Sequence, residues 1–118
     1  MTHPRRGEIF LVSFDPTVGH EIQKTRPAVV IQNDISNQYS PITIVAAISS
    51  HVATPAHPRE VPIPDSSKSG LTAPSAVILN HIRSIDRSRL VKLLGMLDSA
   101  TMRRIDDAIK ISLGLISL

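Results

Sequence analysis

The pattern of apolar positions predicts short β-strands in the first part of the chain. In residues 8–14, phenylalanine and valine side chains point to one side, and isoleucine and leucine point to the other. Residues 27–31 and 42–48 are further runs rich in β-branched side chains, which favour extended backbone. Because the first strand is apolar on both faces, the pattern is typical of a small closed barrel.

Polar connections separate these strands. Residues 15–26 have too few regularly spaced apolar positions for a helix or a strand, so we expect a long loop that ends where Pro27 begins the next strand. Residues 34–41 are rich in Asn, Ser and Gln and are expected to form another connection. Long loops in compact domains more often carry functional residues than serve only as connections. Residues 15–26 are therefore a candidate functional segment.

Proline dominates the middle of the chain. Residues 51–75 hold five of the nine prolines, and only residues 59–63 offer a short strand, which its proline restricts to a sheet edge. Further strands are expected at residues 76–79 and 81–85. Residues 90–97 fit a strand or a helix, and a strand is favoured around Gly95.

The period of the apolar positions changes at Asp98 or Ser99, where a capping residue precedes a helical pattern. Apolar side chains then recur at helical spacing, with charged ones on the opposite side: Met102, Ile105, Ala108, Ile109, Leu113 and Ile116. Many short strands followed by one amphipathic helix predict a mostly β fold with a C-terminal helix. We expect a small antiparallel β-barrel closed by that helix, forming a single domain over residues 1–118.

Composition narrows the function classes. The chain has 118 residues, which leaves room for one domain and no second. It contains no cysteine, which excludes disulfides, thiolate metal sites and cysteine nucleophiles. No apolar run approaches the roughly 18 residues of a membrane span, and no apolar segment follows the basic residues near the start. We therefore expect a soluble protein without a targeting segment.

The charge is mildly basic. The formal net charge is +3 and the pI is about 9.8, which favours a polyanionic partner. Residues 1–60 hold five basic and five acidic side chains, whereas residues 61–118 hold eight and five. A solvated surface that only keeps the protein soluble explains this balance equally well.

Motifs for several enzyme classes are missing. The five histidines do not have metal-ligand spacing, and their closest pair, His51 and His57, lies in the proline-rich segment. The chain also has no glycine-rich phosphate loop and no Gly-x-Ser-x-Gly motif. These observations set aside metalloenzymes, kinases, nucleotide-binding proteins and α/β-hydrolases.

The long loop ends on an arginine. Arg26 directly precedes the strand that begins with Pro27, so the sheet is expected to hold its backbone while its planar guanidinium faces outward. That arrangement suits a phosphate, which a guanidinium grips with two parallel hydrogen bonds. The alternative is a surface ion pair between Arg26 and Glu21.

Several short segments, taken in order, form a specific pattern over nearly the whole chain. They are Arg6-Gly7-Glu8-Ile9, Phe14-Asp15-Pro16-Thr17-x-Gly19-x-Glu21, Arg26-Pro27-Ala28-Val29-Val30-Ile31, Val45-Ala46-Ala47-Ile48-Ser49-Ser50, Gly70-Leu71, Ala76-Val77-Ile78-Leu79, Ile82-Arg83-Ser84-Ile85-Asp86 and Arg89-Leu90. In this order and spacing, the chain resembles the MazF/PemK-type messenger-RNA interferase toxins.

The resemblance implies a homodimeric SH3-like barrel that cuts single-stranded RNA at short sequences, in bacterial or archaeal cytoplasm and without metal or cofactor. It further implies a cognate antitoxin with an acidic, disordered tail that folds into an RNA groove along the subunit interface. Operator DNA is expected only through the antitoxin complex, and no membrane is involved. By position in the motifs, the catalytic residues are Arg26, Ser49 (where threonine is more usual) and Glu21, and the substrate-binding residues are Phe14, Thr17, His20 and His81.

Two of these positions depart from the family pattern. The family often has serine where this chain has His20, and glutamine where it has His81. Each histidine is expected to be a base contact, a proton-transfer group or a solvent-facing bystander. Because both positions are expected to contact RNA, these two histidines are expected to influence which RNA sequence is cut.

The chemistry of metal-free RNA cleavage assigns roles to the catalytic residues. The ribose 2′-OH attacks the adjacent phosphorus, and the products are a 2′,3′-cyclic phosphate and a 5′-OH end. Arg26 is expected to stabilise the negative charge that develops on the phosphoryl oxygens. Glu21 is expected to accept the proton of the 2′-OH, and Ser49 to donate a hydrogen bond to a phosphoryl oxygen. Three other functions stay open: a CcdB-like toxin that binds gyrase, a barrel that holds RNA without cutting it, and an inactive partner of an antitoxin.

Overall fold

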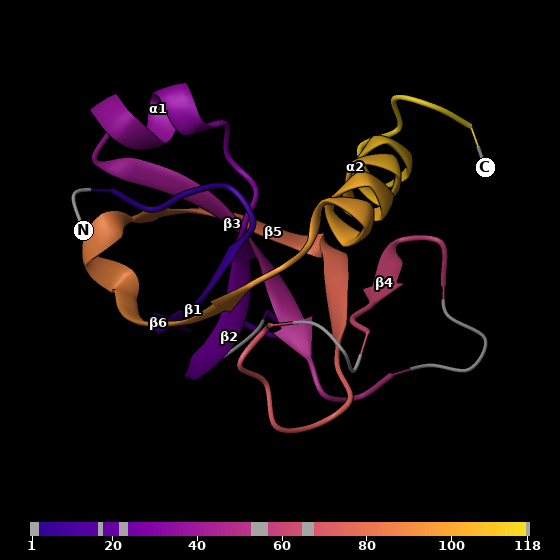
Figure 1. Ribbon diagram of the computed structural model, residues 1–118, viewed down its shortest axis with the longest axis horizontal. Helices are drawn as coiled ribbons and strands as arrows, with labels where there is room; N and C mark the ends of the chain where they lie inside the picture. The colour runs from indigo at the N-terminus through magenta and orange to yellow at the C-terminus, as the bar shows by residue number, and fades with distance from the viewer. Residues whose placement is uncertain (1–2, 17, 22–23, 53–56, 65–67, 118) are drawn as a thin grey trace.

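The computed structural model describes residues 3–16, 18–21, 24–52, 57–64 and 68–117. These residues form six strands, two α-helices and one 3-10 turn. Figure 1 shows how they are arranged. In chain order these are β1 Glu8–Ser13, β2 Thr25–Val30, α1 Asp34–Tyr39, β3 Ile42–Ser49, β4 Glu60–Pro62, β5 Ala76–Asp86, η1 Arg87–Arg89, β6 Leu90–Met96 and α2 Ser99–Ser112.

The strands form one antiparallel sheet in the order β4-β5-β3-β2-β1-β6. This confirms the mostly β class with a C-terminal helix. The strand order is open, because β4 and β6 do not pair with each other in the part of the chain that the structure describes, which corrects the expected strand closure. A non-strand segment approaches β6 instead, where the Met96 backbone N–H donates to the Lys68 carbonyl at 3.0 Å.

Apolar side chains are buried on both faces of the sheet, as predicted for the strands of a small barrel. One core lies under α2, where Ile9, Val29 and Ala46 pack with Ile105 and Ala108. The neighbouring residues on the same strands turn to the opposite face and form a second core: Phe10, Val12, Phe14, Ala28, Val30, Val45, Ala47 and Ile85. The alternation of side chains along each strand explains why one run of apolar residues supplies both cores.

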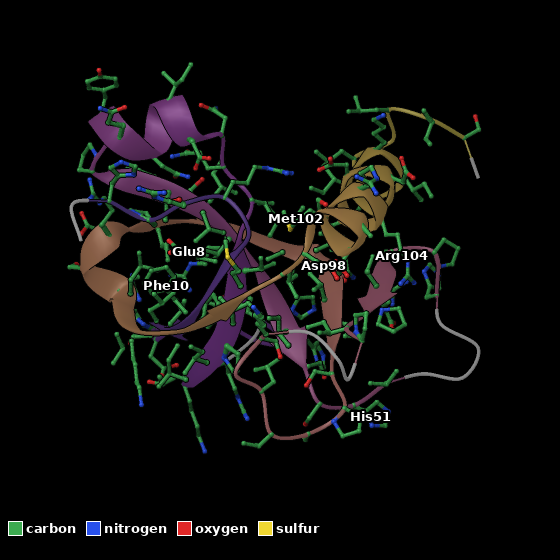
Figure 2. The ribbon with its side chains drawn as sticks, viewed as in Figure 1. Glu8, Phe10, His51, Asp98, Met102 and Arg104 are labelled. Carbon is green, nitrogen blue, oxygen red and sulfur yellow. The ribbon has the colours of Figure 1, made fainter. Side chains whose placement is uncertain are left out.

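The helix α2 begins where the sequence predicted. Asp98 caps it by accepting the Thr101 backbone N–H at 2.8 Å, and this bond, with one from the Thr101 hydroxyl, lowers the pKa of Asp98 (Figure 2). The helix ends at Ser112, so Leu113 and Ile116 of the predicted apolar stripe lie beyond it and are exposed. Among the described residues, no helix is long and apolar enough to cross a membrane.

The connection expected at residues 34–41 contains a helix, α1, which the sequence analysis missed. Asn33 caps it by accepting the Ser36 backbone N–H at 2.8 Å. The buried Asn37 holds it to the sheet, because its amide donates to the Gln32 carbonyl at 2.9 Å and accepts from the Thr43 hydroxyl at 2.7 Å. Polar contacts and not an apolar face hold this helix in place, so the sequence has no helical spacing of apolar residues that would predict it.

Two strand boundaries also differ from prediction. Strand β2 begins at Thr25, so Arg26 lies inside it and Pro27 is its third residue, paired with Leu11. The strands predicted at 76–79 and 81–85 are one strand, β5, with an irregular register. Ala46 pairs with Ile82 while the next residue, Ala47, pairs with Ile78, so three residues of β5 bulge out between them.

Candidate active site

A pocket of about 650 Å³ lies where the β1–β2 connection meets the end of β3. It brings together all three residues expected to be catalytic, since Glu21, Arg26 and Ser49 line it. His20 lines it as well. Hydroxyl groups from Thr72 and Ser75, on the segment before β5, form another side, and these were not anticipated from sequence.

Arg26 and Ser49 lie just beyond the paired part of β2 and β3. These strands pair antiparallel from Ala28 opposite Ala47 to Val30 opposite Val45. Arg26 and Ser49 each stand two residues beyond the first of these pairs, so the alternation along a strand directs both to the same face of the sheet as the two alanines. On this face, the buried apolar side chains of β2 and β3 are therefore followed at the pocket by the guanidinium of Arg26 and the hydroxyl of Ser49.

The guanidinium of Arg26 is exposed and has no hydrogen bond or ion pair with the described residues. The alternative of a surface ion pair between Arg26 and Glu21 is wrong. Glu21 instead accepts the backbone N–H of Val18 through its Oε1 atom. The donors of Arg26 are thus available to a ligand.

Ser49 has a defined hydrogen-bonding state. Its Oγ atom accepts the backbone N–H of His51 at 3.0 Å. A hydroxyl that accepts one bond keeps its own proton for donation. Ser49 can therefore donate a hydrogen bond into the pocket.

The connection between β1 and β2 is fixed at its base. The Phe14 backbone N–H donates to the Lys24 carbonyl at 2.9 Å, and the Lys24 N–H donates to the Asp15 carboxylate at 2.9 Å. Near its tip, a turn is closed by the Glu21 N–H, which donates to the Val18 carbonyl at 3.2 Å. Thr17, expected to contact substrate, lies outside the described residues.

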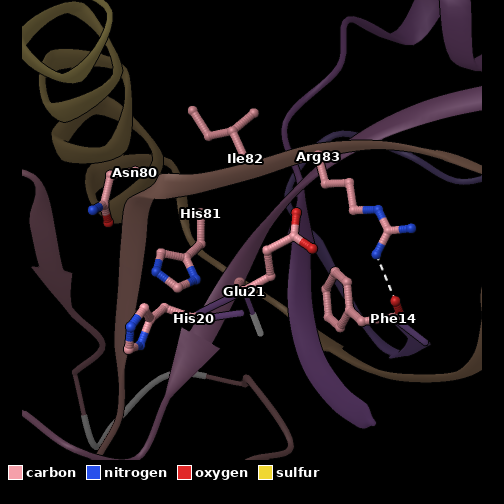
Figure 3. Close-up of a pocket in the computed structure, with 8 residues that line it drawn as sticks. Phe14, His20, Glu21, Asn80, His81, Ile82 and Arg83 are labelled. Carbon is pink, nitrogen blue, oxygen red and sulfur yellow. Dashed lines mark hydrogen bonds between the residues drawn. The ribbon is translucent and has the colours of Figure 1, made fainter. Parts of the chain in front are cut away.

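A second pocket, of about 350 Å³, adjoins the first and shares His20 and Glu21 with it (Figure 3). His81 and Phe14 line it, so the remaining described residues expected to contact substrate meet here. His81 is the last of the three bulged residues of β5, so the register irregularity places it at this pocket.

Phe14 lines this pocket but is largely buried. The residue is only 2% exposed and belongs to the second core, so it forms an apolar wall of the pocket, and its stacking on a base stays a prediction. Its carbonyl accepts from the guanidinium of Arg83, which also lines the pocket (Figure 3). Sequence reasoning quoted Arg83 in the family pattern but gave it no place in the site.

The acidic groups that the structure describes do not gather into a ligand cluster. Among the described residues, no three His, Asp or Glu side chains are placed to hold a metal ion. Asp86 has a lowered pKa because the Ser88 backbone N–H and hydroxyl hydrogen-bond to it, but it caps η1 and lies outside both pockets.

Comparisons with known proteins agree with this arrangement. A family model for the PemK-like, MazF-like toxin of type II toxin–antitoxin systems matches residues 5–113. Endoribonuclease EndoA of Bacillus subtilis (strain 168) is 40% identical over 112 residues, which cover 95% of this chain and 96% of that protein. Endoribonuclease MazF of Staphylococcus saprophyticus is 41% identical over 111 residues, covering 94% and 92%.

The fold has a solved counterpart. The crystal structure of MazF (Form-I) from Deinococcus radiodurans matches with a TM-score of 0.81 at 26% identity, covering 95% of this chain and 97% of that chain. The family match spans both pockets and every element from β1 to α2. The chain therefore belongs to the family of PemK-like, MazF-like toxins of type II toxin–antitoxin systems.

Proposed function

We propose that this endoribonuclease toxin cuts single-stranded RNA at short sequences by attack of a ribose 2′-OH on the adjacent phosphorus, without a metal ion. The products are a 2′,3′-cyclic phosphate and a 5′-OH end. One observation carries the proposal: the unpaired guanidinium of Arg26 lines the same pocket as the hydroxyl of Ser49.

Arg26 stabilises the charge that develops on the phosphoryl oxygens. Its guanidinium offers parallel donors that match two oxygens of one phosphate. The backbone of Arg26 is held in β2 by its pairing with Val12, so the side chain starts from a fixed point at the pocket. Donors that meet the charge developing in the transition state are among the largest contributors to catalysis.

Glu21 accepts the proton of the attacking 2′-OH. Its Oε1 atom is engaged by the Val18 backbone N–H, which orients the carboxylate. The Oε2 atom has no hydrogen bond with the described residues. An oriented carboxylate with one available oxygen suits a general base.

Ser49 donates a hydrogen bond to a phosphoryl oxygen, and Ser49→Ala tests this role. We expect the variant to cleave RNA about 10-fold to 1000-fold more slowly, the range for the loss of one donor. The measurement is single-turnover cleavage of a fixed RNA. Ser84→Ala, an exposed serine of β5 outside both pockets, is the control and should cleave at the wild-type rate. Equal rates for both variants would remove Ser49 from the mechanism.

The smaller pocket binds a nucleobase next to the cut phosphate. Imidazoles of His20 and His81 supply polar contacts, and Phe14 forms an apolar wall. The role of Thr17 stays a prediction. Because His20 and His81 replace the residues often found in the family, we expect the cut sequence of this chain to differ from those of its relatives.

The partners follow from the family. Its description as a toxin of a type II toxin–antitoxin system supports an antitoxin partner. We propose that an acidic, disordered tail of this antitoxin folds over Arg26, because an unpaired cation suits a carboxylate. Operator DNA, bound only through the antitoxin complex, and a cytoplasmic location also stay predictions.

We further propose a homodimer with its RNA groove at the subunit interface. Exposed apolar side chains support the dimer, since Leu113, Leu115 and Ile116 follow α2 with 60%, 69% and 49% exposure. Two copies related by a two-fold axis would cover such a surface. The place of the RNA groove at the interface rests on the family resemblance alone. Sedimentation of a stable, active monomer at micromolar concentration would contradict this proposal.

A parallel assay separates cleavage from the other functions. Purified protein is incubated with a long single-stranded RNA and, separately, with gyrase and relaxed plasmid. We expect RNA fragments with discrete ends and no effect on supercoiling. Gyrase inhibition with intact RNA would indicate a CcdB-like toxin, and RNA binding without new ends would indicate a barrel that only holds RNA.

A further inference from the structure

We infer that His20 is the general acid of this reaction, the group that gives a proton to the departing 5′ oxygen. The inference rests on the proposed function, which assigns charge stabilisation to Arg26, hydrogen-bond donation to Ser49 and proton acceptance to Glu21. None of these three residues is assigned to protonate the departing 5′ oxygen. An alkoxide leaves slowly unless it is protonated as its bond to phosphorus breaks.

His20 has a place that no other described histidine shares. It lines the larger pocket with Arg26 and Ser49, and also the smaller pocket with His81 and Phe14. His81 lines the smaller pocket alone, and His3, His51 and His57 line neither. His20 therefore lies where the two pockets meet. An RNA with its phosphate at Arg26 and the neighbouring base in the smaller pocket would run next to His20 at this junction.

The turn that carries His20 is fixed, but its imidazole is uncommitted. Two hydrogen bonds link Val18 and Glu21, and Gly19 supplies the positive φ of 61° that the turn requires. His20 is exposed at this turn, and its ring nitrogens have no hydrogen bond with the described residues. A ring nitrogen is thus available to carry a proton to a substrate oxygen.

Acid and base leave the turn in different directions. The attacking 2′ oxygen and the departing 5′ oxygen lie on opposite sides of the phosphorus, so the two proton-transfer groups must flank it. Figure 3 shows the carboxylate of Glu21 extending toward Phe14 and Arg83, while the ring of His20 lies beside His81. Glu21 and His20 therefore offer two separate proton-transfer groups to a phosphodiester bound where the two pockets meet.

The step balances without another reactant. Glu21 takes the proton of the 2′-OH as the bond from the 2′ oxygen to phosphorus forms. The bond from phosphorus to the 5′ oxygen breaks, and its electron pair stays with oxygen. An N–H of protonated His20 donates to that oxygen, giving the 5′-OH end and neutral imidazole.

A modified substrate tests this role. Once the cut site of the wild-type protein has been mapped, an RNA is made in which sulfur replaces the bridging 5′ oxygen at that site. A thiolate leaves without protonation, so it needs no general acid. We expect His20→Ala to cut the normal RNA about 100-fold to 10,000-fold more slowly than the wild type does. On the sulfur-containing RNA this loss should shrink to the small factor that a lost base contact causes.

Matched histidine variants provide the controls. His81→Ala should slow both substrates by the same factor, because a base contact does not depend on the leaving group. His51→Ala, which changes an exposed histidine outside both pockets (Figure 2), should leave both rates unchanged. Melting curves of all three variants check that the fold is intact.

The outcomes separate this inference from the proposed function. If His20→Ala slows both substrates equally, or neither, His20 is not the general acid, while the roles of Arg26 and Ser49 stand. If the sulfur substrate rescues His81→Ala and not His20→Ala, the assignment is also overturned. If the wild-type protein leaves no cyclic-phosphate ends on normal RNA, the proposed function itself fails, and this inference fails with it.

Discussion

Replacing Arg26 with alanine should slow RNA cleavage by about 1000-fold or more. The unpaired guanidinium lines the same pocket as Ser49, and its loss removes two donors that suit one phosphate. The change should leave the fold intact, because the side chain of Arg26 is exposed and makes no hydrogen bond with the described residues. Single-turnover cleavage rates and a melting curve measure both effects.

Two variants sharpen the Arg26 result. Arg26→Lys keeps the charge but loses the parallel donors, so its rate should lie between those of the wild type and the alanine variant. Arg103→Ala removes an exposed arginine of α2 and gives the same net charge as Arg26→Ala, but should cleave normally. If Arg26→Ala kept wild-type cleavage while His20→Ala or His81→Ala lost it, a histidine-based mechanism would replace the present one.

Gly95→Ala should destabilise the protein by about 3 kcal/mol. Gly95 lies in β6, and a Cβ atom there would overlap the backbone of Lys68 and Ser69. This backbone segment crosses β6 closely and accepts the Met96 N–H, so it cannot move away without losing that bond. Denaturant unfolding at neutral pH measures the difference in the free energy of unfolding.

Gly114→Ala separates crowding from backbone strain. Gly114 has a φ of 73°, but no atom lies within 4 Å of an added Cβ. Its substitution should therefore cost only about 1 kcal/mol, the strain of a left-handed residue. Equal, small losses for Gly95→Ala and Gly114→Ala would contradict the close approach of residues 68–69 to β6.

The strands and the terminal helix could be predicted because their apolar periods are regular. Ile9 and Phe10 alternate between the two cores, and Ile105 and Ala108 face the sheet, as the periods of strand and helix require. Helix α1 has no such period, since Asn37 anchors it through buried hydrogen bonds. The bulge of β5 depends on pairing with β3, a distant segment, and leaves no local trace in the sequence.

The candidate site was predictable in its residues and not in its shape. Arg26 and Glu21 lie close together in the sequence, but only the folded chain shows that Ser49 lines the same pocket. The burial of Phe14 reflects packing with Ala28, Ala47 and Ile85, which the family pattern does not reveal. His20 was singled out by its residue type, whereas its position at the junction of two pockets emerges from the folded loop.

End-group analysis of cleaved RNA tests the central claim most directly. A long single-stranded RNA is incubated with the purified wild-type protein in EDTA, and the new termini are identified chemically. Attack by the ribose 2′-OH predicts 2′,3′-cyclic phosphate and 5′-OH ends, formed at the same rate with and without EDTA, and almost none with Arg26→Ala. New 5′-phosphate ends, or cleavage that stops in EDTA, would contradict the mechanism.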